Sequence, residues 1–103
     1  MITVQGLEDY SLRDIQTIVL LHIDHLRESF HFEDLDFSIK AIIPFGSRIT
    51  GFSSKKSDLD VRIEYTGTAR EDDLLNALND KNVNFEIENI KVDFYPENIG
   101  QFK

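Results

Sequence analysis

The chain contains no cysteine and comparatively few basic residues. Without cysteine, disulfides and thiolate metal sites are excluded, and a reducing compartment is permitted. Eleven Lys and Arg against nineteen Asp and Glu give a net charge of −8, which argues against general nucleic-acid binding because that binding needs cations to neutralise phosphates. No stretch approaches the roughly 20 apolar residues that span a bilayer, and the N-terminus lacks a signal-peptide pattern. We therefore expect a cytoplasmic protein without a membrane segment.

The length and the apolar content bound the architecture. One hundred and three residues are one domain's worth, so residues 1–103 are expected to form a single unit. With 41% hydrophobic residues and eight Phe, the chain can bury a core, although a domain of this size has a small stability margin.

The first third of the chain predicts one long helix. Residues 1–10 show no periodic pattern and are expected to form an extended or frayed arm. Ser11 is the expected N-cap, with Asp14 in the first turn, and apolar residues recur at helical spacing to about Phe30. Three further apolar residues make this stripe wider than one contact requires: Ile18, Leu20 and Leu21. The helix is therefore expected to pack on a sheet, with apolar surface left for a partner.

Two histidines of this helix, His22 and His25, have the i, i+3 spacing that places side chains on one helix face. Zinc sites use three or four ligands, and no third donor of matching spacing is evident, His31 included. We expect these histidines to be ordinary helix-surface residues.

The remaining elements are predicted by alternation and by turn residues. Strands are expected at 38–45, 58–65, 83–87 and 90–95, with a turn at Glu88-Asn89 and a stop at Pro96. A short helix starting at Ser47 and a helix from a Thr68/Glu71 capping box to about Asn79 complete the set. This order predicts an α/β (α+β) fold: a small mixed sheet covered on one face by helices.

The strand expected at 58–65 carries two aspartates at its start. Residues i and i+2 of a strand point to the same face, so Asp58 and Asp60 should lie side by side while Leu59 and Val61 enter the core. A pair of carboxylates suits hard cations, and Mg²⁺ suits best because it keeps coordination positions for water and phosphate. When an Asp-x-Asp motif occurs without other evidence, it is more often a solvated strand edge than a metal site.

The segment before these aspartates fits an anionic ligand. Gly46 permits close backbone approach, and Ser47 offers a hydroxyl and an amide at a helix start. Residues 48–62 contain four basic and two acidic residues, a local charge of +2 in a chain of net charge −8. We therefore predict a phosphate site formed by Gly46 and Ser47, with Arg48, Lys55 and Lys56 offsetting phosphate charge.

Gly46-Ser47, ten intervening residues and Asp58-Leu59-Asp60 resemble the signature of the nucleotidyltransferase superfamily that includes DNA polymerase beta. The short form is most similar to the minimal nucleotidyltransferases, which often act as antitoxins beside helical HEPN-domain toxins. The resemblance covers roughly residues 38–95 and implies a third carboxylate on a later strand, a place that Asp93 fits.

The resemblance implies a Mg²⁺-dependent enzyme that uses ATP or another NTP, with two metal ions held by Asp58, Asp60 and Asp93. It would transfer a nucleoside monophosphate, AMP in the first instance, to a hydroxyl, for example a tyrosine of a HEPN-type toxin. The alternative is an antitoxin with little or no catalytic activity, which neutralises a helical toxin by forming a complex.

Overall fold

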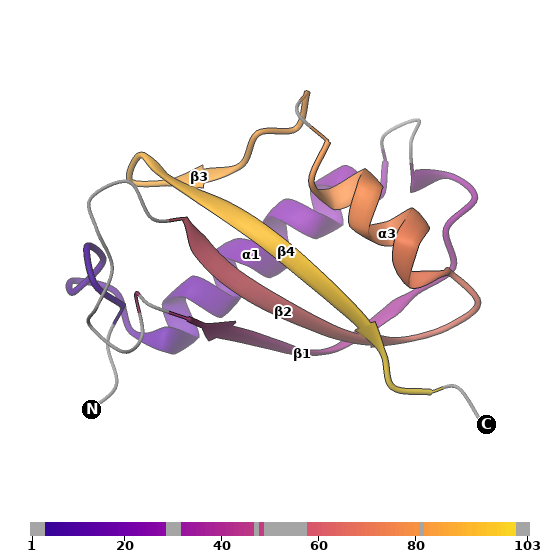
Figure 1. Cartoon of the computed structure of the whole chain (residues 1–103), viewed down its shortest axis with the longest axis horizontal. Helices are drawn as coiled ribbons and strands as arrows, with labels where there is room; N and C mark the ends of the chain where they lie inside the picture. The colour runs from indigo at the N-terminus through magenta and orange to yellow at the C-terminus, as the bar shows by residue number, and fades with distance from the viewer. Residues whose placement is uncertain (1–3, 29–31, 47, 49–57, 81, 101–103) are drawn as a thin grey trace.

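The computed structural model describes residues 4–28, 32–46, 48, 58–80 and 82–100. These residues form two helices and four strands (Figure 1): α1 (Leu12–Leu26), β1 (Ser38–Phe45), β2 (Leu59–Thr66), α3 (Glu71–Leu78), β3 (Glu86–Ile87) and β4 (Ile90–Asn98). The fold is the small α+β arrangement that the sequence predicts. The expected short helix and loop at 47–57 lie outside the described residues, except for Arg48. No helix in the described ranges is long and apolar enough to cross a membrane.

The sheet is mixed and has the strand order β1-β2-β4-β3. β1 pairs antiparallel with β2, β2 pairs parallel with β4, and β4 pairs antiparallel with the short β3. Along β2, Leu59, Val61, Ile63 and Tyr65 are fully buried while the residues between them are half-exposed. The buried face joins one core with α1 and α3, so both helices cover one face of the sheet. In the described part of the chain no helix covers the other face, which we call the open face.

The N-terminal segment is not the frayed arm that we expected. Val4 and Leu7 are buried in the core, and the backbone N–H of Gln5 donates to the backbone carbonyl of Arg48 over 2.8 Å. The segment leads into α1 through the predicted cap, since Ser11 and Asp14 form a reciprocal capping box. Burial of two aliphatic side chains, each worth roughly 1.5–3 kcal/mol, explains why a stretch without periodicity is nonetheless fixed.

Helix α1 ends at Leu26, earlier than the predicted Phe30, with Arg27 as its C-cap. The Arg27 guanidinium lies 3.8 Å from the centroid of the Phe37 ring. His22 is half-buried and not an ordinary surface histidine: its ring stacks on Phe85 with centroids 3.9 Å apart, and its buried Nε2 has no hydrogen-bond partner among the described residues. Burial lowers the pKa of His22, because desolvation disfavours the charged imidazolium.

Helix α3 begins without the capping box predicted for Thr68 and Glu71. Its N-cap is Arg70, which makes no side-chain cap bond. The Thr68 amide and hydroxyl both donate to Asp36, and the Glu71 carboxylate accepts from the backbone N–H of Asn98. Long-range partners therefore replaced the local pairing that the spacing suggested.

Strand β3 is shorter than the predicted 83–87, because Asn84 adopts a positive φ of 35°. Glu88 and Asn89, at φ 51° and 68°, form the expected turn into β4. Pro96 does not end β4, which continues to Asn98. β3 pairs only with Ile90 and Lys91, so the rest of the outer side of β4 has no strand neighbour among the described residues. The missing N–H of Pro96 therefore costs no hydrogen bond between strands.

Side chains of α3 and of its C-cap residue form hydrogen bonds with the outer backbone of β4, in the part of β4 that β3 does not pair with. The Asn79 side chain accepts from the N–H of Phe94 and donates to the Phe94 carbonyl, each over 2.8 Å. Glu71 accepts from the N–H of Asn98, and Pro96 between them has no N–H. The Asn79 side chain thus makes the hydrogen bonds that a neighbouring strand would make, at the residue next to Asp93.

We expect Asn79→Ala to lower the free energy of unfolding by about 2 kcal/mol, because it leaves two partly buried backbone groups of Phe94 unpaired. Urea unfolding followed by circular dichroism measures this difference. The exposed Asn82, three residues away, is the matched control, and Asn82→Ala should stay within about 0.5 kcal/mol of the parent. Equal losses in both variants would contradict the structural role of the Asn79 amide.

Candidate functional site

The open face of the sheet brings together the three aspartates predicted from the sequence. Asp60 on β2 lies opposite Phe45 of β1 on one side and opposite Asp93 of β4 on the other. Asp58 immediately precedes β2 and forms a side-chain hydrogen bond with Asp93. The parallel pairing of β2 with β4 therefore joins carboxylates that are 33 to 35 positions apart in the chain.

Asp58 and Asp93 share a proton-dependent contact. The hydrogen bond to Asp93 raises the pKa of Asp58, and burial and the Asp93 charge raise it further, while the cation of Lys91 opposes them. Lys91 Nζ lies 3.5 Å from the Asp93 carboxylate. Two neighbouring carboxylates bind a proton more tightly than one alone, because ionising both sets like charges side by side.

Asp60 is held by different neighbours. Burial raises the pKa of Asp60, the Asp93 charge raises it further, and a hydrogen bond from the Tyr95 hydroxyl lowers it. Burial likewise raises the pKa of Tyr95, with the charges of Asp60 and Asp93 adding to the effect. Tyr95 therefore donates to Asp60 as a neutral phenol.

Gly46, the residue after β1, approaches Asp60 closely. Its φ of 92° lies in the left-handed region, and a Cβ at this position would stand 2.7 Å from Asp60 Oδ2. Any side chain here would combine backbone strain with a clash against the carboxylate. Gly46, predicted for the phosphate site, thus also leaves space for the Asp60 carboxylate on the open face.

The predicted basic residues divide into two groups. Arg48 does not present a free cation: it is 5% exposed, and its Nη1 donates to the Gln5 carbonyl over 2.7 Å. It anchors the N-terminal segment, so the expected phosphate contact from its side chain is replaced by a structural role. Ser47, Lys55 and Lys56 lie outside the described residues.

The donor set on the open face has the right chemistry for a hard divalent cation, since it consists of carboxylate oxygens. The hydrogen bond to Asp93 raises the pKa of Asp58 and burial raises the pKa of Asp60, and in both cases the negative charge of Asp93, which a cation would offset, adds to the effect. Within the described ranges, however, no three His, Cys, Asp or Glu side chains are arranged as a metal-binding group. Asp58 and Asp93 are hydrogen-bonded to each other, so a bound cation would take the place of that contact.

Sequence reasoning did not predict the contacts that Tyr95 and Arg62 make on this sheet face. Alternation already placed Lys91, Asp93 and Tyr95 on one strand face, but the hydrogen bond from Tyr95 to Asp60 depends on the β2–β4 register. Arg62, on the same face, forms ion pairs with Glu64 and Glu97. It is therefore engaged with its neighbours on the sheet.

Comparison with known protein families gives a match. A family model described as Nucleotidyltransferase domain matches residues 23–103, which include the glycine turn and all three aspartates. No curated protein and no solved structure shows a significant match.

We expect Asp58→Asn to stabilise the protein in EDTA at neutral pH by up to about 1 kcal/mol, because it removes one like charge and keeps a donor toward Asp93. The sign follows from the raised pKa of Asp58. The folded state binds the proton of Asp58 more tightly than the unfolded chain does. Ionised Asp58 therefore lowers the free energy of unfolding by the full amount above its folded-state pKa, and this loss is absent below its unfolded-state pKa.

The measurement is urea unfolding of both proteins at pH 7 and near ~3.5, just below the ordinary Asp pKa. The gain should be present at pH 7 and should disappear in acid. Asp34→Asn, at an exposed position away from the sheet face, is the control and should show no such gain. A destabilised Asp58→Asn at pH 7 would refute the repulsion.

Proposed function

Because the chain belongs to the nucleotidyltransferase domain family, we propose that it transfers a nucleoside monophosphate from an NTP, in the first instance AMP from ATP, to an acceptor hydroxyl. The observation that carries the proposal is the cross-strand pairing of Asp60 with Asp93, with Asp58 hydrogen-bonded to Asp93. Three carboxylates on an otherwise open sheet face are costly unless a cation offsets them. Such a cluster is expected where a protein binds metal and phosphate together.

In this mechanism the acceptor oxygen forms a bond to the α-phosphorus as the bond to the β-phosphate oxygen breaks. Pyrophosphate leaves with that electron pair, and the proton of the acceptor hydroxyl passes to solvent water. When bound to Asp58, Asp60 and Asp93, one or two Mg²⁺ ions would supply charge stabilisation for the attacking and leaving oxygens.

The protein's own residues have distinct tasks. Asp58 and Asp60 would hold the metal-bound nucleotide, and Asp93 would activate the acceptor hydroxyl through its negative charge. Gly46 and Ser47 hold the terminal phosphates by backbone N–H groups, with Lys55 and Lys56 offsetting their charge. Tyr95 orients Asp60 by the hydrogen bond that it donates.

We further propose that the protein acts in the cytoplasm on a helical partner of the HEPN type, as an antitoxin, with a partner tyrosine as the acceptor. The alternative proposal is neutralisation by binding alone. The exposed Leu20 and Leu21 on α1, 40% and 64% accessible, favour a protein partner in either case. A neighbouring reading frame that encodes a short helical protein with an Arg-x₄₋₆-His motif would support both versions.

Asp60→Ala should abolish transfer, because Asp60 is one of the two carboxylates proposed to hold the metal-bound nucleotide and lies opposite Asp93. The assay incubates the full chain with Mg²⁺, each radiolabelled NTP and the product of the neighbouring frame, and looks for label on either polypeptide. The parent should also gain thermal stability from Mg²⁺ with ATP. Absence of a thermal shift at millimolar ligand, or near-native transfer by Asp60→Ala, would refute the site, whereas Asp34→Asn should transfer normally.

Asp93→Asn should separate chemistry from binding. It keeps the shape of the side chain and removes the charge assigned to acceptor activation, so transfer should fall by orders of magnitude. Mg²⁺-dependent ATP binding through Asp58 and Asp60 should remain within about tenfold, or 1.4 kcal/mol. Calorimetric titration with Mg²⁺ and a non-hydrolysable ATP analogue measures that affinity.

The same variant distinguishes the two proposed functions. Toxin neutralisation that survives Asp93→Asn without transfer would assign protection to binding. Loss of both, in a complex that still forms, would assign it to modification. Normal transfer by Asp93→Asn would remove this residue from the mechanism.

A further inference from the structure

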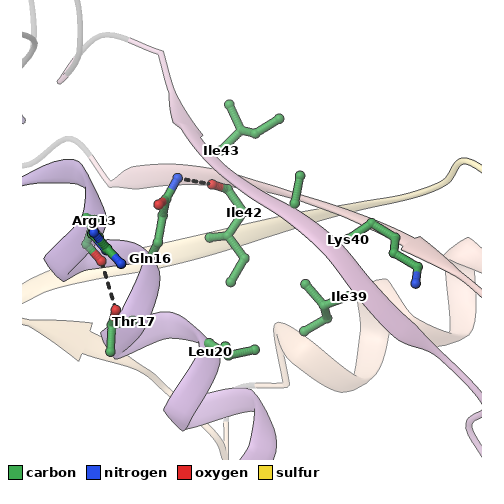
Figure 2. A pocket seen from close by; sticks show the side chains of 9 residues that line it. Arg13, Gln16, Thr17, Leu20, Ile39, Lys40, Ile42 and Ile43 are labelled. Atoms are coloured by element: carbon green, nitrogen blue, oxygen red, sulfur yellow. Dashed lines mark hydrogen bonds between the residues drawn. The ribbon is translucent and has the colours of Figure 1, made fainter.

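A groove of about 490 Å³ lies between helix α1 and the edge strand β1, on the helix-covered side of the sheet. In Figure 2, Leu20 of the helix and Ile39 and Ile42 of the strand point into the space between the two elements. Leu20 is 40% exposed although it lines this apolar space. The groove therefore holds apolar surface that α1 and β1 do not cover.

The charges along the groove are all of one sign. Arg13 on α1 and Lys40 on β1 are among its nine lining residues, and none of the nine is acidic. Neither cation has a salt-bridge partner in the described parts of the chain. In a protein of net charge −8, this region favours an anionic ligand with an apolar surface.

The edge of β1 is poorly suited to accept another strand. The Gln16 side chain donates to the Ile42 carbonyl over 2.9 Å, as Figure 2 shows, so this outward-facing acceptor is already occupied. Pro44, two residues further on and facing the same edge, has no N–H to donate. The register shift between Ile39 and Ala41 breaks the ladder at the other end. A partner must therefore bind through side chains.

A second copy of this chain fits the groove badly. A two-fold contact would bring the same surface of each copy together. Arg13 and Lys40 would then face their own equivalents, with no acidic lining residue to pair with them. Two chains of net charge −8 would also repel each other at low salt.

We propose that this groove binds an amphipathic α-helix of a partner protein, with the apolar stripe of that helix seated on Leu20, Ile39 and Ile42. Acidic residues on both sides of the stripe would pair with Arg13 and Lys40. Helix-in-groove recognition uses apolar residues at i, i+3, i+4 and i+7, which side-chain contacts alone can read. The site does not depend on nucleotidyl transfer, because its lining includes none of the aspartates of the open face.

The test uses the full chain and three synthetic peptides of about 18 residues, long enough for several helical turns. One carries leucines at helical spacing flanked by glutamates, the second has lysines in place of the glutamates, and the third has the first composition in alternating, strand-like order. Amide chemical shifts locate binding, and titration measures affinity at low salt.

The glutamate-flanked helix should bind saturably and shift the amides of Leu20, Ile39 and Lys40. The other two peptides should bind at least about tenfold more weakly. Arg13→Glu or Lys40→Glu should weaken the glutamate peptide by about fivefold or more and strengthen the lysine peptide. Arg70→Glu makes the same charge change at the exposed start of α3 and should alter neither.

Leu20→Ala should weaken the first peptide, whereas Leu75→Ala, a comparably exposed leucine on α3, should not. Circular dichroism checks that each variant is folded. The proposal is overturned by equal binding of the lysine peptide, preference for the strand-like peptide, shifts mapped elsewhere, or no saturation by about 1 mM peptide. Self-association that shifts the same groove amides would overturn it in favour of a second copy.

Discussion

The parallel pairing of β2 with β4 is the constraint on which the candidate site depends. It sets Asp60 opposite Asp93 and brings Asp58 within hydrogen-bonding reach of Asp93. The pairing is held by burial of the opposite face, where Leu59, Val61, Val92 and Phe94 enter the core. A slip of one residue would exchange the two faces and bury the aspartates. Core packing therefore fixes the spacing of charges that repel one another.

The surroundings of β4 keep this strand in place although β3 covers only its first two residues. The Asn79 amide bonds both backbone groups of Phe94, and Glu71 bonds the N–H of Asn98. At the other side of the site, Gly46 leaves room for the Asp60 carboxylate. Arg48 ties the N-terminal segment to the turn after β1. These contacts order the frame of the site without occupying the carboxylates.

The two faces of the molecule suit different ligands. The open sheet face presents carboxylates beside the exposed Phe45 and Tyr95, and its chemistry suits metal-bound phosphate. The groove beside α1 presents aliphatic side chains between two cations and suits a protein surface. These two surfaces lie on separate parts of the fold and share no lining residue.

The sequence by itself determined those features that depend on near neighbours in the chain. Residues 38–45 form the predicted strand, Ser11 and Asp14 form the predicted cap, and alternation put Asp60 on the less buried side of β2. These follow from spacings of two to four residues, at which strand and helix geometry alone decide which side chains share a face.

Only the tertiary structure decided contacts between distant segments. Thr68 bonds Asp36 in place of a local cap, Pro96 lies within β4 because no strand pairs there, and Arg48 is buried against Gln5. A residue can interact with any group that the folded chain brings near, and at each of these positions groups distant in the sequence, not local ones, decide the structure. The register that sets Asp60 opposite Asp93 belongs to the same class, because it is fixed by how the buried faces of β2 and β4 pack together.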